Sequence, residues 1–330
     1  MKNKRYNYGT AILSAFEYLL ENYKETFVIG QGLWSPWYVG NSMNDLDKKF
    51  GKDRIIDTPV SESASTGAAI GASLSGMKPI IVHPRMDFML YAMDPIVNQA
   101  AKWSYMFGGQ SNAGVTIRSI INRGGEQGAQ HSQALHAWFT RIPGLRVVMP
   151  STVLDARDLL ISSVLCKDPV LYIDDRWLYD QEDDLPPIVE RELSSEKPNI
   201  RLAGNDLTIV SSGHSSYLVR EACKKIKNDN ISPEIIDVRV LNPLYSKDII
   251  NSVKKTRKLL VVDPGWISSG FSAELISKVV ENIDASCLKK PPIRIALPDA
   301  PAPTSTNLEK EYYTSIENIL SSIRKLMKNK

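Results

Sequence analysis

Short β-forming runs alternate with helical patterns along the chain, and this alternation limits the fold more than any other feature. The first half contains the runs "TFVIG", "RIIDT", "KPIIVH", "GVTIRSII", "RVVMP" and "PVLYID". Helical patterns separate them, among others over residues 62–75, 90–105 and 132–141. The pattern predicts an α/β fold in which a doubly wound parallel sheet is covered by helices on both faces. Runs such as "PIIV" are apolar at every position, as expected of strands buried on both faces.

An interruption of the alternation predicts two doubly wound α/β domains. Residues 179–199, "YDQEDDLPPIVERELSSEKPN", are acidic and rich in proline, as linkers often are. The runs "DLTIVSSG", "PEIIDVR", "KLLVVDP" and "PIRIALP" then restart the pattern, and a last helix is expected over residues 308–327. We therefore predict a first domain over residues 1–180, a linker over 181–200 and a second domain over 201–330.

Composition and charge favour a cytoplasmic protein without nucleic-acid or membrane partners. The formal net charge is only +3, which is too weak to indicate a polyanionic partner. No run approaches the roughly 20 apolar residues of a membrane span, and we expect no secretory signal. The three cysteines are far apart in sequence and form no metal-ligand or redox motif, so reduced thiols are expected.

Several polar residues follow strands, where ligands of doubly wound sheets bind. Gln31 follows the first of these strands, and His83, Arg85 and Asp87 follow "KPIIV". The last three residues fit an ordinary loop as well as a pocket edge with fixed positive charge. His131 lies in "GGEQGAQHSQALHAWF", where we expect a helix to begin near the histidine. Such a helix start can bind an anion, but a lone histidine there is more often a capping or core residue.

The segment "DTPVSESASTGAAIGASLSG" places one carboxylate, Glu62, at the head of a helix made of small residues. The helix dipole favours an acidic side chain in the first turn, which is a sufficient structural explanation for Glu62. The alanine and glycine positions leave two faces of the helix without bulk, so another backbone can approach closely. We therefore expect this helix to pack against another helix or a subunit.

The motifs taken together resemble one family. They occur in order and cover essentially the whole chain: "RIIDTPVSE", "GAAIGASLSG", "DPIVNQAAK" with "YMFGG", "GAQHSQ", "PGLRVVMPST", "VRVLNP", "VVDPGW" and "LPDAPAPTS". The chain resembles the beta subunit of the thiamin-diphosphate-dependent dehydrogenase component of 2-oxoacid dehydrogenase complexes, of the pyruvate, branched-chain oxoacid and acetoin types. This subunit belongs to the transketolase-like superfamily. The resemblance implies a pyrimidine-binding domain followed by a transketolase C-terminal-like domain.

The resemblance also implies a cofactor, partners and a reaction. A separate alpha subunit would hold the diphosphate of thiamin diphosphate and its Mg²⁺ ion, while this chain would hold the aminopyrimidine ring and no metal. No diphosphate-binding segment of the G-D-G…N type is visible here, which agrees with a separate alpha subunit. Two alpha and two beta subunits would assemble, and a lipoyl acyltransferase core is a further partner. The implied reaction decarboxylates a 2-oxoacid and transfers the acyl group to lipoamide.

Individual residues match family positions. By resemblance, Glu62 is the carboxyl group that binds a pyrimidine ring nitrogen and helps the cofactor lose the proton of its reactive carbon. Phe88 matches the aromatic residue that packs on the pyrimidine, and Gln31 stands at a cofactor-facing position that is usually acidic. His131 matches the histidine near the substrate and the incoming lipoyl group. Glu62 and His131 are therefore the expected catalytic residues.

Three segments depart from the family pattern. "GQGLW" replaces the usual Gly-Glu-Glu/Asp-Val, "HPRMDF" replaces an aromatic and apolar segment, and "INRGGEQG" replaces a Pro-Asn-Gly loop. These changes remove acid and introduce His83, Arg85 and Arg123. Because arginine suits the binding of carboxylate or phosphate, we expect a substrate with extra negative charge or hydroxyl groups, and assign these three residues to it.

Two other functions stay open. A split transketolase or an acyloin-forming enzyme would keep the cofactor and pass a two-carbon unit to an aldehyde or a sugar, which the altered pocket residues would accommodate. A non-catalytic scaffold would need neither Glu62 nor Phe88 nor His131, so their joint presence argues against it.

Overall fold

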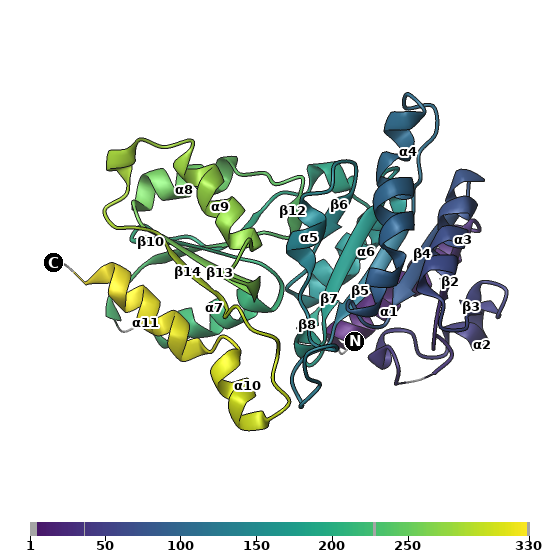
Figure 1. Cartoon of the computed structure of the whole chain (residues 1–330), viewed down its shortest axis with the longest axis horizontal. Helices are drawn as coiled ribbons and strands as arrows, with labels where there is room; N and C mark the ends of the chain where they lie inside the picture. Colours follow the sequence, from purple (N-terminus) through teal and green to yellow (C-terminus); the bar gives the residue numbers. More distant parts are fainter. Residues whose placement is uncertain (1–4, 36, 227–228, 329–330) are drawn as a thin grey trace. The chain divides into compact units, whose positions relative to one another are not determined.

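The computed structural model describes residues 5–35, 37–226 and 229–328, and Figure 1 follows the chain through its helices and strands. The chain divides into two compact units. The first consists of residues 1–122 and 138–196, and the second consists of residues 123–137 and 197–330. The segment 123–137 therefore packs with a part of the chain that lies much later in the sequence, which the sequence analysis did not predict.

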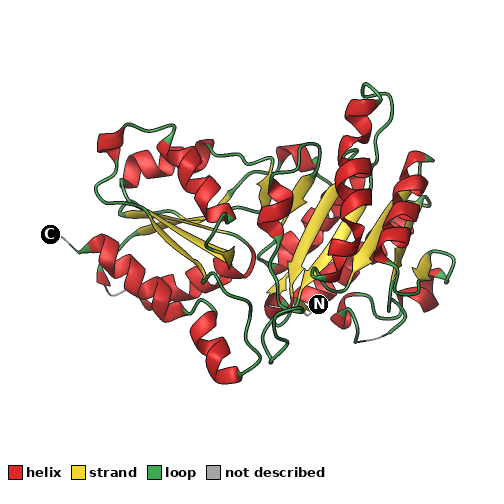
Figure 2. Ribbon diagram, in the orientation of Figure 1, coloured by secondary structure: helices red, strands yellow, loops and turns green. Residues whose placement is uncertain are grey.

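A parallel sheet forms the centre of the first unit, as predicted, and Figure 2 shows its strands in yellow. Its strands are ordered β6-β7-β5-β4-β2-β3, and each runs parallel to its neighbours. Their bounds are β2 (Thr26–Gly30), β3 (Ile55–Asp57), β4 (Lys78–His83), β5 (Thr116–Ile121), β6 (Arg146–Val148) and β7 (Val170–Asp175). Every residue of β5 and of β7 is buried, which explains why their sequences do not alternate between apolar and exposed polar positions.

The α-helices that lie wholly in the first unit are α1 (Tyr8–Asn22), α2 (Leu46–Phe50), α3 (Glu62–Leu74), α4 (Ala101–Met106) and α6 (Val153–Leu165). Shorter helical turns are η1 (Gly40–Ser42), η2 (Phe88–Ala92), the π-helical η3 (Pro95–Ala100), η4 (Arg176–Leu178) and η5 (Leu193–Ser195). The helix expected over residues 90–105 is thus divided into η2, η3 and α4. Pro95 stands at the first turn of η3, where its missing N–H prevents a regular helix from continuing.

The helix expected near His131 begins later than predicted. Residues 131–135 are not helical, and the short helix α5 spans His136–Thr140. The preceding chain turns through left-handed backbone, including Glu126 at φ 63° and Gly128 at φ 72°, so helical backbone starts only at His136. His131 therefore lies in a loop and not at the start of a helix.

Part of the segment expected to be a linker forms regular structure. β8 (Glu182–Asp184) pairs antiparallel with β1 (Arg5–Asn7) in a small separate sheet. The side chain of Asn7 also caps α1, where Thr10 completes a capping box. The acidic run thus contributes to fixing the N-terminal part of the described chain.

The second unit contains a five-stranded sheet of order β14-β13-β10-β11-β9. Its strands are β9 (Asn199–Leu202), β10 (Leu207–Ser211), β11 (Pro233–Asp237), β13 (Leu259–Trp266) and β14 (Ile293–Leu297), and the unit also has the short strand β12 (Val240–Asn242). Strand β9 runs antiparallel to β11, so this sheet is mixed, whereas we expected a wholly parallel one. The β9 residues alternate between half-buried and exposed, as an edge strand allows.

The helices of the second unit are α7 (Gly213–Lys225), α8 (Lys247–Thr256), α9 (Phe271–Val280), α10 (Thr306–Tyr312) and α11 (Ile316–Met327), with the turn η7 (Ala285–Cys287). The single helix expected over residues 308–327 is interrupted because Ser315 caps α11 through Asn318 and starts a new helix. Apolar residues of α7 and α11, such as Val219, Ile319 and Ile323, form a buried core with the sheet. None of the helices in the described part of the chain is long and apolar enough to cross a membrane.

Candidate active site

Neighbouring strands of the first unit bring several predicted residues to one edge of the sheet. β2, β4 and β5 lie side by side and run parallel, so their carboxyl ends point the same way. Gln31 follows β2, Arg85 lies just beyond β4 and Asn122 follows β5. This is the edge at which doubly wound sheets bind ligands.

Glu62 is the first residue of α3, which begins after the end of β3. Its side chain is half-buried, and Ser61 before it makes no side-chain cap to the helix. Among the residues that the structure describes, none hydrogen-bonds to the Glu62 carboxylate or forms an ion pair with it. Helix α3 packs against η2, the turn that begins at the half-buried Phe88. An unengaged carboxylate and an aromatic side chain thus come from two elements in contact.

His83, the last residue of β4, points into the protein. Its side chain is only 2% exposed, and its Nε2 lies 3.1 Å from the Thr66 hydroxyl of α3. Burial lowers the pKa of His83 to about 4 because the charged imidazolium is poorly solvated there. His83 is therefore neutral near pH 7. The prediction that it adds positive charge to a pocket edge is wrong.

Arg85 keeps the positive charge that His83 lacks. Its guanidinium is half-buried. With the Asn122 amide oriented so that its oxygen faces Arg85, that oxygen accepts bonds from Nη1 at 3.0 Å and from Nη2 at 3.3 Å. The residue that follows β5 thereby orients a cation that stands beyond β4.

Gln31 begins a loop that is rich in aromatic residues and held by a carboxylate that the sequence analysis missed. Its Nε2 donates to the hydroxyl of Tyr38 at 2.9 Å. The Asp57 carboxylate at the end of β3 accepts from the Gly32 N–H at 2.6 Å. Gly32 has φ +70°, and a Cβ there would lie 2.0 Å from the Tyr38 ring, so only glycine fits. Asp57 could have been found from its position at the end of a strand.

Arg123 and His131 belong to the second unit. Arg123 is buried, and its Nη1 donates to the carbonyl of Pro264 at 2.9 Å. Its guanidinium carbon also lies 6.0 Å from the centroid of the Tyr313 ring. These contacts give Arg123 a structural role within the unit, whatever ligand it contacts. The His131 side chain is half-buried in its loop.

Comparison with known proteins identifies the family. Residues 4–181 match the transketolase pyrimidine binding domain, and residues 196–319 match the transketolase C-terminal domain. The chain is 34% identical over 321 residues to the pyruvate dehydrogenase E1 component subunit beta-1, mitochondrial, of Arabidopsis thaliana, with 96% of this chain and 87% of that protein covered. It is 38% identical over 276 residues to the acetoin:2,6-dichlorophenolindophenol oxidoreductase subunit beta of Cupriavidus necator, with 84% and 81% covered. The chain belongs to the family of these beta subunits.

Two further comparisons qualify this assignment. The pyruvate dehydrogenase E1 component subunit beta of Rhizobium meliloti is 33% identical over 301 residues, and the match covers 91% of this chain but 65% of that protein. A solved structure described as a split gene transketolase, inactive beta4 tetramer, superposes with a TM-score of 0.79 at 18% identity over 98% of both chains. The latter likeness concerns the fold alone.

One buried pair in this family member was missed by the sequence analysis. His136 Nε2 lies 2.9 Å from Asp263 Oδ1, and both side chains are essentially inaccessible. Asp263 stands inside "VVDPGW", a motif that carried the family resemblance, whereas His136 lies three residues after the motif "GAQHSQ". An aspartate that follows an apolar run is a detectable signal, but its partner histidine could not be inferred from spacing.

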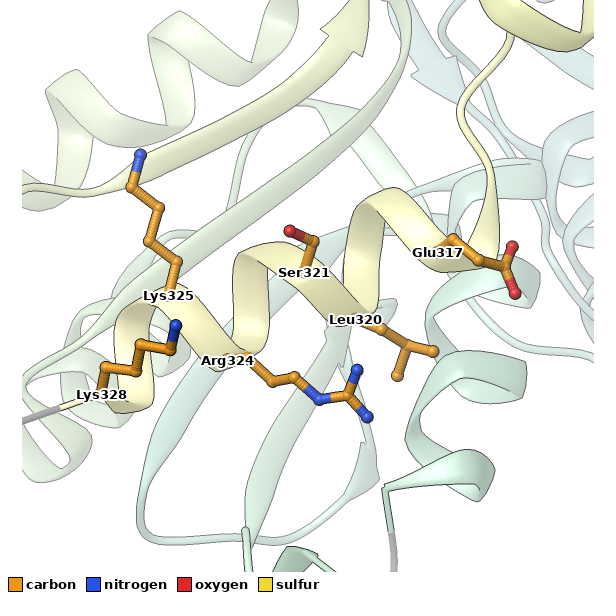
Figure 3. Close-up of a pocket in the computed structure, with 6 residues that line it drawn as sticks. All are labelled: Glu317, Leu320, Ser321, Arg324, Lys325 and Lys328. Carbon is orange, nitrogen blue, oxygen red and sulfur yellow. The ribbon is translucent and has the colours of Figure 1, made fainter.

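Two cavities of the second unit lie along α11 and contain none of the predicted site residues. The cavity in Figure 3 has a volume of about 450 Å³ and is lined by Glu317, Leu320, Ser321, Arg324, Lys325 and Lys328. A second one, of about 780 Å³, is lined mainly by lysine, proline and aliphatic residues. The residues predicted for the active site lie elsewhere, at strand ends and helix starts of the first unit or, for Arg123 and His131, in the second unit.

Proposed function

We propose that the chain is the beta subunit of a thiamin-diphosphate-dependent 2-oxoacid dehydrogenase, which decarboxylates a 2-oxoacid together with a separate alpha subunit and transfers the acyl group to lipoamide. The observation that carries this proposal is the unengaged Glu62 carboxylate at the head of α3, next to the turn of Phe88, in a member of the beta-subunit family. A cytoplasmic location and docking to a lipoyl acyltransferase core are parts of the same proposal.

The residues present fit the aminopyrimidine ring of thiamin diphosphate. Glu62 has no competing partner in the described part of the chain, so its carboxylate can bind a ring nitrogen and hold a proton there. Phe88 would pack on the ring face, and the Gln31 amide would face the ring edge. When bound, the cofactor supplies the carbon chemistry. His131 would exchange a proton with the substrate or the lipoyl thiol.

The Mg²⁺ ion is assigned to the alpha subunit. Among residues 5–35, 37–226 and 229–328, no three His, Cys, Asp or Glu side chains are grouped so that they could hold a metal ion. Helix α3 supports assembly with a partner, because Ala64, Gly67, Ala68 and Gly71 are exposed on it. A Cβ added at Gly67 or Gly71 would meet no atom within 4 Å. We propose that this face packs closely in an assembly of two alpha and two beta subunits.

The proposed substrate carries more negative charge or more hydroxyl groups than pyruvate. Arg85 supports this because Asn122 holds its cation at the ligand edge of the sheet. His83 does not contribute charge, although its neutral ring can still line the site. Arg123 remains a predicted substrate residue, but its Nη1 already bonds to Pro264.

Reductive acylation of a lipoyl domain tests this function. The chain would be purified with an alpha-type subunit from the same organism and supplied with a panel of 2-oxoacids that differ in charge and hydroxylation. We expect acyl-lipoyl product, with a preference for a charged or hydroxylated acid that Arg85→Gln reduces more than it reduces the reaction of pyruvate. Cofactor-dependent decarboxylation without any acyl-lipoyl product would contradict the proposed acceptor.

A second candidate, a split transketolase or acyloin-forming enzyme, is favoured by the aromatic loop after Gln31. Trp37 is 78% exposed and Tyr38 is 42% exposed. Aromatic faces near polar groups are suited to stacking on the apolar face of a sugar ring. Replacing the lipoyl domain by aldehydes and sugars in the same assay separates the two functions, because only this candidate yields a carbon–carbon coupled product.

A further inference from the structure

Hydrogen bonds at both ends and in the middle of the loop of residues 123–137 connect it to later parts of the second unit. At its start, Arg123 donates to the Pro264 carbonyl. In the middle, the Glu126 N–H donates to Glu309 Oε1 at 3.0 Å, and Glu126 Oε1 accepts from the N–H and the hydroxyl of Thr306 at 3.0 and 2.8 Å. Glu126 has a left-handed φ of 63°, a costly conformation that these bonds hold in place.

The end of the loop is held by the buried pair of His136 and Asp263. The Asp263 carboxylate accepts from His136 Nε2 at 2.9 Å, from the Gly265 N–H at 3.0 Å and from the Ser272 N–H at 2.7 Å. Burial raises the pKa of Asp263, but His136 and the two backbone N–H groups outweigh it and hold that pKa below its usual range. The carboxylate is thus ionised and oriented by three donors.

The surroundings leave the imidazole little freedom. The Phe271 ring stands edge-on to His136 at 6.2 Å between centroids. A Cβ added at Gly265 would lie 2.9 Å from His136 Cε1, so this glycine lets the ring and the strand approach each other. His136 Nδ1 is buried and has no hydrogen-bond partner in the described part of the molecule. In the described part of the molecule, the hydrogen bond from Nε2 to Asp263 is therefore the one that orients the imidazole ring.

A buried carboxylate with a polar partner is an inefficient way to stabilise a core. Taking such groups out of water is costly, and apolar replacements of similar volume often stabilise a protein as well or better. A directional pair does, however, fix orientation and register, which an apolar contact does less well. In sequence, His131 lies between Glu126 and His136, the two residues that anchor the middle and the end of the loop.

We propose that His136 and Asp263 are positioning residues, which hold the loop so that His131 meets the acyl-transfer step. The proposal rests on the function proposed above for His131. The pair acts through the backbone of the loop and contacts neither substrate nor cofactor. Loss of the Nε2 donor would let the loop end shift, and a displacement of about 1 Å can slow a reaction about 100-fold.

Two substitutions of matched length test the pair. His136→Gln retains a side-chain N–H donor that can reach Asp263, whereas His136→Met has a similar reach and no donor. We expect His136→Met to slow acyl transfer about 10- to 100-fold with little change in KM for the 2-oxoacid. His136→Gln should recover most of the lost rate. Arg201→Gln, which alters the Arg201–Asp237 ion pair of the same unit, is the control and should leave the rate unchanged.

A double-mutant cycle with His131→Ala distinguishes positioning from general stabilisation. If His136 acts through His131, adding His136→Met to His131→Ala causes no further loss of rate. Multiplicative losses, or equal rates for the Met and Gln variants, would overturn the proposal.

Hydrogen exchange of residues 124–135 provides a readout that needs no activity. His136→Met should raise exchange in this loop, while His136→Gln and Arg201→Gln should not. Unchanged exchange in His136→Met would show that the pair does not hold the loop. An inactive wild-type complex would contradict the proposed function, and the exchange experiment alone would then show whether the pair fixes the loop.

Discussion

The first unit contains two acidic side chains in opposite situations. Asp174 on β7 is fully buried and binds Arg118 of β5 through two bonds, at 3.2 and 2.9 Å. The Tyr179 hydroxyl also donates to it, and Ser42 accepts from Arg118 at 2.9 Å. Glu62 is half-buried and has no partner in the described part of the chain. One carboxylate is enclosed by donors, and the other is left available.

This difference separates charges that hold the fold from charges that are free to act. Burial disfavours the charged form of Arg118, but Asp174 outweighs it and raises the pKa of the guanidinium. Both members of the pair are therefore charged and already bonded to each other. A group that must share a proton with a ligand cannot be bonded in this way, because its protein partner would have to be displaced at every turnover. Substitutions at the two sites should consequently affect different measurements.

Glu62→Gln should have the largest effect on activity and almost none on stability. The amide keeps the shape of the side chain but cannot hold the proton, and loss of such a group slows a reaction about 100- to 10,000-fold. Turnover of the assembled complex and thermal unfolding should be measured together. Near-normal turnover would exclude Glu62 as the proton-sharing group, and a large loss of stability would show that it is structural after all.

Arg118→Met should have the opposite pattern. Removing one partner leaves Asp174 charged and buried without its main donor, which costs about 3–5 kcal/mol of folding free energy. The double variant Arg118→Met/Asp174→Leu should recover part of that loss, since no unpaired charge remains. Denaturant unfolding measures both variants. Activity per folded complex should stay near normal. A specific catalytic defect would contradict the assignment of Arg118 to the fold and of Glu62 to the reaction.

His83 should make the free energy of unfolding depend on pH. The unfolded chain protonates this residue near its ordinary pKa of 6.5, whereas the folded chain does so only near about 4. As the pH falls through this window the unfolded state binds a proton that the folded state does not, so stability is lost on acidification. The loss should reach about 3 kcal/mol at pH 4, and about 2 kcal/mol of it should already be lost at pH 5.

His83→Gln is the matching variant, because its amide can still bond to Thr66 but does not titrate. Its unfolding free energy should vary less between pH 6.5 and 5 than that of the wild type, a window in which most carboxylates change little. Parallel pH profiles for the two proteins would show that His83 is accessible to protons in the folded state.

Most of the first sheet and the head of α3 could be predicted from sequence, since apolar runs and first-turn signals act locally. The interruption at Pro95 was a local signal that the expectation of one helix over residues 90–105 overlooked. The late start of α5 at His136 and the antiparallel β9 could not be predicted, because tertiary packing decides these features. The candidate site could likewise be predicted only in part. Sequence motifs indicated Glu62 and Phe88, but only the fold reveals that His83 is buried and neutral.

The exposed face of α3 offers the smallest and most selective test, because it separates the isolated chain from the proposed assembly. Gly67 lies in the helix, and a Cβ there meets open space. Gly67→Ala should therefore stabilise the isolated chain by about 0.5–1 kcal/mol, through helix propensity alone. If a partner backbone packs on this face, the same methyl group should weaken the complex, and Gly67→Leu should weaken it further. Thermal unfolding of the chain and sedimentation of the complex measure the two effects. A stabilised chain with unchanged assembly would show that the face stays exposed, and the small residues of α3 would then need another explanation.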